Sequence, residues 1–509
     1  MPEMEETLCN YISKHFLEGS AEPFDSDTEL IESGILDSNA MLSLVSFVEK
    51  QYGIDFSTSE IVVQNLETVK ALVKFIQTKL TDTTSLPSAD DLSSGQPATP
   101  AQDVFNVFDP IELKAYSTED EMAHTNLRVK DQAARKLKIN GKDFIDFASC
   151  NYLGLDYHPY VMDSISKLVR KWGTHPSWAR FVASPDPYFE LEEKLAEFIK
   201  APTTVVFPCI ALMNTGVLPI LAGPRGVILC DTVAHHTIQE ACQLSIMKGI
   251  MCVHFQEDDI DHLEKQLKRF QHKSPLLIAV DGVYSMSARY IDLPAYSALA
   301  KKYNAQLYVD DAHGLGVIGE NPTEDIPYGH KGNGIVNYYG MSYEEDHIIY
   351  VSGLSKSFSS FASFITCHDD ETESRLRLAS TYVLSGPIPV ASMATAMAGL
   401  EVNEKEGDSI RKTVYSLANQ LVEGAISIGF EVDNTGSFPI VFVVVGGYKQ
   451  TVIASDICWK YGLLNSTAVF PFVQMNRNGL RFSITALNTS GEIDYALNVL
   501  SEIFKKVNK

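Results

Sequence analysis

Short apolar runs alternate with longer amphipathic stretches along most of the chain after about residue 105. The runs that are rich in β-branched residues predict strands, and they are TTVVF (203–207), GVILC (226–230), PLLIAV (275–280), QLYVD (306–310) and HIIYVSG (347–353). Strands that alternate with helices are typical of a parallel sheet with helices on its faces. Two later segments, FPIVFVVVGG and LRFSITAL, indicate a further domain. We therefore expect an α/β fold with a central, mostly parallel sheet over residues 105–400, and a small α+β domain over residues 401–509.

The first eighty residues follow a different pattern, in which apolar positions recur with helical spacing. Leu42, Val45 and Val48 fall on one face of such a helix. Residues 81–104 are rich in Ser, Thr, Pro and Asp, a composition that cannot bury a core. We therefore expect a small all-α bundle over residues 1–80, followed by a flexible linker.

The charge balance and the apolar runs exclude several classes of partner. The chain carries 41 basic and 65 acidic side chains and a net charge of −24. Such a field repels phosphate backbones, so we expect no nucleic-acid binding. The acidic first segment does not resemble a secretion signal, and no apolar run is long enough for a membrane span, so we expect a cytoplasmic protein. The eight cysteines include no C-x-x-C pair, which indicates neither a zinc module nor a disulfide framework.

Two aspartates and a histidine directly follow the apolar run 306–310. Asp310, Asp311 and His313 lie at the end of a predicted parallel strand, where ligands bind in such sheets. Buried carboxylates need a cationic partner. A magnesium ion there would need a phosphate substrate, and a zinc ion would need further ligands. His235 and His236 are candidates for these, so a metal site stays open on composition alone.

Lys356 lies at the end of another predicted strand, in the segment SGLSKSF. Its neighbours are small and apolar, and desolvation there would lower the pKa of the amine and favour a Schiff base. A Schiff-base lysine needs a carbonyl cofactor. Pyridoxal phosphate fits, because its pyridine nitrogen requires a carboxylate partner to stay protonated. The cation beside Asp310 is then a pyridinium, and His313 is within reach of the phenolic oxygen.

Five motifs, taken in order, carry a resemblance to a known family. They are SCNYLGL (149–155), DTVAHHTI (231–238), DGVYSM (281–286), VDDAHGLGVIGE (309–320) and SGLSKSF (352–358). Together they resemble the α-oxoamine synthases, which are fold-type I pyridoxal-phosphate enzymes. The resemblance implies a homodimer that condenses a small amino acid (glycine, alanine or serine) with an acyl thioester. Carbon dioxide is lost in this reaction and an α-aminoketone is formed.

The resemblance also implies roles for individual residues. Lys356 would bind the cofactor covalently, His235 would stack on its ring, and Arg481 would bind the substrate carboxylate. The predicted catalytic residues are Lys356, His235, Asp310 and His313; the predicted cofactor-binding residues also include Ser285, Ile210, Ala211, Ser352 and Ser355; and the predicted substrate-binding residues are Arg481 and Asn151.

Departures from the family pattern cluster around the cofactor phosphate. Ile210 and Ala211 stand where the family has a glycine and an aromatic residue, and Gly353 replaces a threonine. Backbone N–H groups can still bind phosphate at this position, because side chains do not supply them. Ser352 and Ser355 are the candidates to compensate for the missing threonine.

The chain differs from the family at two further positions, where Tyr188 and Asn488 replace common histidines. None of the changes affects the four predicted catalytic residues, so we expect an active enzyme. Two alternatives stay open. The chain could be a different fold-type I enzyme, such as an aminotransferase or an aldolase-type enzyme, or a non-catalytic scaffold for docking partners.

The segment IESGILDSNAMLSLVSFVEKQYGIDF (31–56) resembles an acyl or peptidyl carrier protein. It has a turn at Gly34, an Asp-Ser pair, an apolar helix and a Tyr-Gly stop. In that family the serine carries a 4'-phosphopantetheine arm, and Ser38 is the matching position. Taken alone, Ser38 could also be a helix cap. Asn39 stands where the family has leucine.

A fused carrier implies a source for the acyl group. An arm on Ser38 would present the thioester to the synthase along the linker, at a raised effective concentration. The implied partners are a phosphopantetheinyl transferase and an acyl-loading enzyme. This combination on one chain is associated with secondary metabolism.

Overall fold

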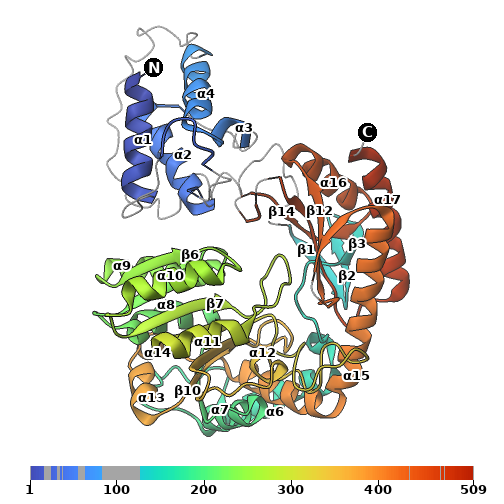
Figure 1. The fold of residues 1–509 in the computed structure, drawn as a ribbon. Coiled ribbons are helices and arrows are strands. Elements are labelled where there is room, and N and C mark those ends of the chain that lie inside the picture. Colours follow the sequence, from blue (N-terminus) through green and yellow to red (C-terminus); the bar gives the residue numbers. More distant parts are fainter. Residues whose placement is uncertain are drawn as a thin grey trace, which may run out of the picture.

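The computed structural model describes residues 2–16, 24–30, 35–36, 38–54, 63–82, 127–434, 436–470, 472–474 and 476–507. The predicted linker at residues 81–104 lies outside these ranges except for its first two residues. Figure 1 shows three parts, which are a large domain around a central sheet, a smaller domain formed by the C-terminal elements, and a bundle of N-terminal helices. Within the described residues, no helix is both long enough and apolar enough to cross a membrane.

A seven-stranded sheet forms the centre of the large domain, in the order β4-β10-β9-β8-β7-β5-β6. Its strands are β4 (Thr203–Phe207), β5 (Val227–Asp231), β6 (Met251–Phe255), β7 (Leu276–Asp281), β8 (Gln306–Asp310), β9 (Ile348–Gly353) and β10 (Ser363–Cys367). The pairs among β6, β5, β7, β8 and β9 are parallel, and only β10 runs antiparallel to its neighbours β4 and β9. The expected mostly parallel sheet is therefore present. Five of its strands match the predicted apolar runs, whereas β6 and β10 were not predicted.

Helices cover both faces of this sheet because successive strand residues point to opposite sides. In β8, Leu307 and Val309 join one apolar core, while Tyr308 between them joins the other. One core also contains residues of α7, α10 and α11, and the second contains residues of α8 and α9. The helices of this domain are α6 (Pro159–Trp172), α7 (Asp186–Ile199), α8 (Ile210–Ala222), α9 (His236–Met247), α10 (Ile260–Phe270), α11 (Leu293–Tyr303), α12 (Ile335–Tyr338), α13 (Asp370–Arg377) and α14 (Ser380–Val383), with the short 3-10 helix η2 (Leu155–Tyr157).

The smaller domain is built on an antiparallel sheet in the order β11-β12-β15-β14. Its elements are β11 (Glu431–Asp433), β12 (Ile440–Gly446), β14 (Ser466–Ala468), β15 (Asn478–Ser483), α16 (Tyr448–Lys460) and α17 (Ser490–Val507). A third sheet joins β1 (Val129–Ala133), β2 (Lys136–Ile139) and β3 (Lys142–Asp146) to β13 (Leu463–Leu464). The residues before the central sheet therefore pack beside the C-terminal elements.

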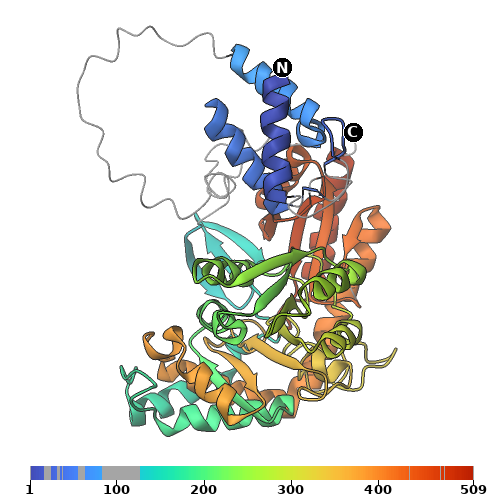
Figure 2. The same cartoon turned by 60° about the vertical axis from the view of Figure 1, so that its left-hand side comes forward.

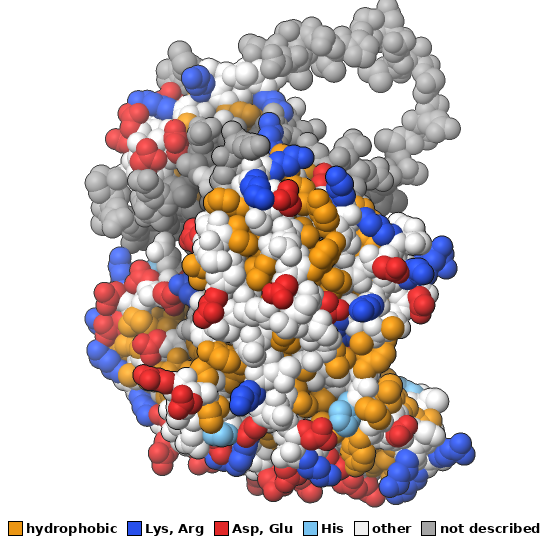
Figure 3. Space-filling model, turned by 90° about the vertical axis from the view of Figure 1, so that its right-hand side faces the viewer, with side chains coloured by type: hydrophobic (Ala, Val, Ile, Leu, Met, Phe, Trp, Pro, Cys, Tyr) orange, Lys and Arg blue, Asp and Glu red, His pale blue; other side chains and the backbone are white. Residues whose placement is uncertain are grey.

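One long helix, α15 (Val390–Ile428), connects the two domains. Its 39 residues span about 58 Å. Val390 and Met393 at its start pack in the core of the large domain, whereas Leu421 and Ala425 near its end pack in the core of the small domain. The boundary predicted at residue 400 lies inside this helix. On the described part of the face in Figure 3, which includes the small domain, acidic and basic side chains are interspersed and form no basic stripe.

The N-terminal bundle consists of α1 (Pro2–Phe16), α2 (Ser38–Tyr52), α3 (Val63–Leu66) and α4 (Val69–Asp82). Val45 and Val48 of α2 are buried in its apolar cluster together with Leu8, Leu72 and Ile76. The expected helical periodicity is therefore present here. The side chain of Leu42 lies outside the described residues.

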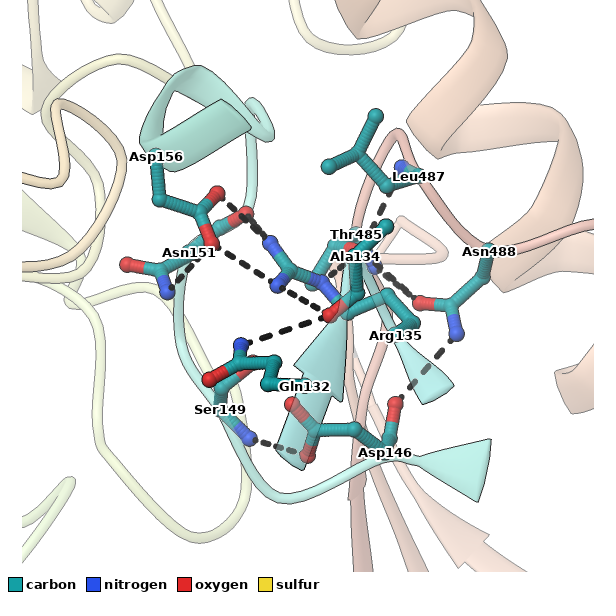
Figure 4. A network of polar contacts seen from close by, with 10 residues as sticks. All are labelled: Gln132, Ala134, Arg135, Asp146, Ser149, Asn151, Asp156, Thr485, Leu487 and Asn488. Atoms are coloured by element: carbon teal, nitrogen blue, oxygen red, sulfur yellow. Dashed lines mark hydrogen bonds and ion pairs between the residues drawn. The ribbon is translucent and has the colours of Figure 1, made fainter. Parts of the chain in front are cut away.

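A buried arginine at the β1–β2 turn joins this third sheet to both domains. Figure 4 shows the Arg135 guanidinium between Asp156 and Thr485. It donates to the two carboxylate oxygens of Asp156 at 2.8 and 2.9 Å and to the Thr485 hydroxyl at 2.9 Å. Asp156 follows the SCNYLGL motif and Thr485 follows β15, so one side chain links three segments that are far apart in the sequence.

We predict that Arg135→Met lowers the free energy of unfolding by about 3 kcal/mol, because it leaves the partly buried Asp156 carboxylate without its bidentate partner. Urea unfolding of the full chain would measure this loss. Lys138→Met is the matched control on β2, since Lys138 is exposed and lies 3.8 Å from Asp143. That change should cost less than about 0.5 kcal/mol. Equal losses in the two variants would contradict a role for Arg135 as a structural link.

Candidate active site

The carboxyl ends of four parallel strands bring most of the predicted residues to one edge of the sheet. His235 follows β5, Ser285 follows β7, Asp310 ends β8, and Lys356 lies three residues after the end of β9. Ligands bind at this edge of open α/β sheets, because side chains that follow adjacent strands converge there. The sequence order of the motifs thus becomes a spatial cluster.

Asp310 is buried, and its carboxylate accepts only neutral donors. One oxygen accepts the Ala312 N–H at 3.1 Å, and the other accepts the Asn214 amide at 3.0 Å. Asn214 is fully buried in α8, and its own carbonyl accepts the Tyr308 hydroxyl at 2.6 Å. Within the described ranges no lysine or arginine forms an ion pair with Asp310. A buried carboxylate in this state provides a place for a cationic ligand.

Lys356 has a lowered pKa. Burial is the largest cause and the positive charge of Arg481 adds to it, while the carboxylates of Asp310 and Asp281 act in the opposite direction. A lowered pKa increases the fraction of neutral amine, which is the nucleophilic form. No hydrogen bond holds the Lys356 amine among the residues that the structure describes, and the side chain remains partly exposed. Lys356 therefore keeps some solvent access, and among the described residues no hydrogen bond has to break before its amine reacts with a carbonyl group.

His313 is a buried, neutral ring held by a tyrosine. Its Nδ1 lies 2.8 Å from the hydroxyl of Tyr152. Burial holds the pKa of His313 well below its usual range, and the charges of Lys356 and Arg481 lower it further. The imidazole is therefore uncharged at neutral pH. Tyr152 belongs to the SCNYLGL motif, but the sequence analysis did not single it out.

His235 caps helix α9 and is fixed from two sides. Its Nδ1 accepts the backbone N–H of Thr237 at 3.3 Å, so the proton of the neutral ring resides on Nε2. The His235 backbone N–H donates to both carboxylate oxygens of Asp281 at 3.1 Å. Burial lowers the pKa of His235 and raises the pKa of Asp281 well above its usual value. The ring is thus oriented by Thr237 and the segment by Asp281.

Arg481 reaches from the small domain to the large one. From β15 its Nε donates to the Ser285 carbonyl at 2.8 Å, and one Nη donates to the Ser483 hydroxyl at 3.0 Å. Both terminal nitrogens lie 3.8 Å from the sulfur of Cys150. Burial alone would raise the pKa of Cys150, but the charges of Arg481 and Lys356 outweigh it and lower the pKa. Cys150 is thus a further residue of the site that the sequence analysis missed.

The start of α8 offers an anion site where the family resemblance places the phosphate. The helix begins at Ile210 after Cys209, and no side chain in the described part of the chain caps it. Its first N–H groups have no intrahelical acceptor, and the helix dipole favours an anion there. A Cβ on Gly353 would lie 3.8 Å from Cβ of Ile210, so these two residues, which both depart from the family pattern, are direct neighbours.

The two serines near this turn differ in availability. The Ser352 hydroxyl is buried and donates to the Asp311 carbonyl at 3.1 Å. Ser355 is exposed, and its oxygen would lie 3.7 Å from a Cβ on Gly353. Ser355 is therefore the more accessible hydroxyl. With the free helix terminus, the buried carboxylate and the accessible amine, the residues present fit pyridoxal phosphate.

Two amides that the sequence analysis named, Asn151 and Asn488, belong to the Arg135 network of Figure 4. Asn151 donates to Asp156 at 3.3 Å. Asn488 accepts the N–H and the hydroxyl of Thr485 at 2.9 Å and donates to the Asp146 carbonyl at 3.3 Å. Both side chains thus stabilise the segments that flank the site.

Three other residues that the sequence analysis named, Tyr188, His236 and Ser38, are not part of this cluster. Tyr188, at the other substituted histidine position, donates to the Ile388 carbonyl. His236 is exposed beside Glu240 at 3.6 Å, and among the described residues no group of three His, Cys, Asp or Glu side chains could hold a metal ion. Ser38 is the first residue of α2, but its side chain lies outside the described residues.

Comparison with known proteins identifies the family to which the chain belongs. The aminotransferase class I and II family matches residues 142–500. The 8-amino-7-oxononanoate synthase of Petrotoga mobilis is 30% identical over 374 residues, which cover 73% of this chain and 91% of that protein. A serine palmitoyltransferase of Sphingobacterium spiritivorum is 28% identical over 379 residues, which cover 74% of this chain and 91% of that protein.

A solved structure agrees with these relatives. The serine palmitoyltransferase from S. paucimobilis, in a variant with a bound PLP–myriocin aldimine, aligns with a TM-score of 0.69 at 25% identity. The alignment covers 75% of this chain and 93% of that one. The predicted fold-type I architecture and enzyme class are therefore confirmed. The chain belongs to the α-oxoamine synthases, pyridoxal-phosphate-dependent acyl-transferring enzymes within the aminotransferase class I and II family.

Proposed function

We propose that this enzyme condenses glycine, alanine or serine with an acyl thioester carried by its own N-terminal bundle, and releases carbon dioxide and an α-aminoketone. The convergence of Lys356, Asp310, His313 and Arg481 at one sheet edge carries the proposal for the chemistry. It combines an accessible amine of lowered pKa, a buried carboxylate without a cation, a neutral imidazole and an arginine from the facing domain. The similarity to an 8-amino-7-oxononanoate synthase and to a serine palmitoyltransferase supports the reaction type.

Each of these residues has a defined task in the proposed reaction. Bound pyridoxal phosphate supplies an electron sink for the negative charge that develops at the α-carbon. The Lys356 amine would attach the cofactor and, when free, would remove the α-proton as a general base. Asp310, oriented by Asn214, would keep the ring nitrogen protonated. His235 would pack against the ring, and His313 would form a hydrogen bond with its phenolic oxygen.

Arg481 is the group that orients the amino acid. Among the described residues, its two terminal nitrogens share the Cys150 thiol as a neighbour, at 3.8 Å, and a substrate carboxylate is a far better acceptor. Because Nε stays bonded to the Ser285 carbonyl, the guanidinium can bind a carboxylate without losing its anchor. The contact spans the two domains, so it also aligns them around the substrate.

The N-terminal bundle is proposed to be the acyl carrier, with 4'-phosphopantetheine on Ser38. The position of Ser38 at the start of α2, and the apolar core of the bundle, support this role. A phosphopantetheinyl transferase would add the arm and an acyl-loading enzyme would charge it. Such a tethered donor is suited to secondary metabolism. We further propose a homodimer, supported by exposed apolar side chains such as Phe181, Val182 and Leu384.

We predict that the purified protein with added pyridoxal phosphate shows the visible absorption of a lysine-bound cofactor, and that Lys356→Ala abolishes it. The reason is that Lys356 supplies the only amine at this sheet edge within the described residues. Lys412→Ala, an exposed lysine on α15, is the control and should keep the band. Absence of the band in the unchanged protein would favour the scaffold alternative. A band without release of carbon dioxide would favour an aminotransferase or an aldolase-type enzyme.

We predict that Asn214→Ala weakens cofactor binding by on the order of tenfold, because Asp310 loses its side-chain hydrogen bond. Titration of the apo-protein with pyridoxal phosphate would measure the dissociation constant. Asn337→Ala is the control, since Asn337 is also a buried amide of the large domain, and among the described residues its side chain donates to Ile199, Asn333 and Tyr343 and not to Asp310. It should lower stability and leave cofactor affinity unchanged. Equal affinity in the Asn214 variant would refute its role in orienting Asp310.

We predict that Ser38→Ala abolishes turnover of an acyl group loaded on the carrier and leaves turnover of free acyl-coenzyme A unchanged. The missing hydroxyl removes the attachment point for the arm and does not touch the synthase. Mass spectrometry after treatment with a phosphopantetheinyl transferase should show modification of the unchanged chain and of Ser46→Ala, but not of Ser38→Ala. Modification of the Ser38 variant would sink the proposal of a carrier at this position.

A further inference from the structure

Among the residues that the structure describes, the apolar cluster of the N-terminal bundle contains one residue from the distant small domain. This residue is Phe470, which follows β14 and retains only 7% of its exposure. Every other member of the cluster belongs to the first 76 residues. Figures 1 and 2 agree with this contact, because in both views the bundle lies beside the C-terminal elements, and Figure 1 shows β14 on the side of the small domain that faces the bundle. The bundle therefore has a defined contact with the body of the enzyme.

The segment that carries Phe470 is anchored at both of its ends. The Phe470 N–H donates to the side chain of Asn478 at 2.8 Å, and Asn478 in turn donates to the Gly446 carbonyl at 2.9 Å. Arg477 pairs with Glu431 and Asp433, which both belong to β11, at 2.7 Å each. These bonds tie Phe470 and Arg477 to β11 and β12. The aromatic side chain is thus presented in a fixed position, which reduces the entropy lost on docking.

The same strand connects this segment to the active site. Asn478 begins β15, and Arg481 lies three residues further along it, which corresponds to about 10 Å. A bundle held at Phe470 is therefore close to the side of the site where Arg481 would bind the substrate. An acyl group on a flexible arm would start its path near its acceptor.

We propose that Phe470 is the docking anchor for the chain's own N-terminal bundle, and that this contact holds the acyl carrier beside the active site during transfer. The acyl part rests on the proposed function, whereas the contact itself does not. A single aromatic anchor makes a small interface, which tethering can compensate because it raises the effective concentration of the bundle. A weak interface also suits a carrier that must leave to be loaded.

The contact can be tested by small-angle X-ray scattering on the full chain. Phe470→Asp places a charge in the apolar cluster and should release the bundle, which increases the radius of gyration. Phe470→Leu keeps an apolar anchor and should restore the compact form. Ile426→Ala removes an exposed apolar side chain at the end of α15 and should change nothing. Identical scattering from the Asp variant and the unchanged protein would overturn the docking contact.

A second measurement tests the role of the contact in transfer. In a single turnover from the loaded carrier, Phe470→Asp should be slower on the order of tenfold, while turnover of free acyl-coenzyme A is preserved. Equal slowing with both donors would mean that Phe470 only supports the fold and would overturn the docking role. If the unchanged chain cannot use its loaded carrier, yet the scattering separates the variants as expected, the proposed donor fails and the docking contact stands.

Discussion

The buried carboxylate of Asp310 is the constraint on which the rest of the site depends. A carboxylate at the end of a central strand is costly unless a cation accompanies it, and here its protein partners are the neutral Asn214 amide and the Ala312 N–H. Asn214 is held in turn by Tyr308, from the same strand as Asp310. This arrangement orients the carboxylate without neutralising it. It therefore preserves an interaction that only a positively charged ligand can complete.

Most of the large-domain residues that could be predicted from the sequence lie at or just after the end of a strand, whereas Arg481 lies within β15. An apolar run marks a strand, and parallel strands share one carboxyl edge, so Asp310 and Lys356 had to lie near each other. Asn214 and Cys150 could not be found in this way. Asn214 sits on a helix, where a buried amide leaves no mark in the periodicity. Cys150 lies next to the predicted Asn151, but only the backbone geometry shows that the thiol faces Arg481, whereas Asn151 bonds Asp156.

The departures near the phosphate show a second limit of the sequence. When the chain is compared with the family one position at a time, Ile210 and Gly353 are two separate departures from the residues expected near the phosphate. In the structure they are neighbours, so a larger residue on one element faces a smaller one on the other. Such an exchange conserves volume, which packed interiors tolerate best. The N–H groups at the start of α8 remain available through this exchange. Pairing of this kind requires knowledge of which helix faces which strand.

One strand of the small domain, β15, connects the contact with the large domain to the contact with the N-terminal bundle. Arg481 on β15 bonds the Ser285 carbonyl of the large domain, and Asn478 at the start of β15 holds the segment of Phe470. In the proposed reaction, the residue that would bind the amino-acid carboxylate and the segment that would hold the carrier are therefore positioned by one strand. Their separation is set by β15 itself, which places Arg481 about 10 Å from Asn478.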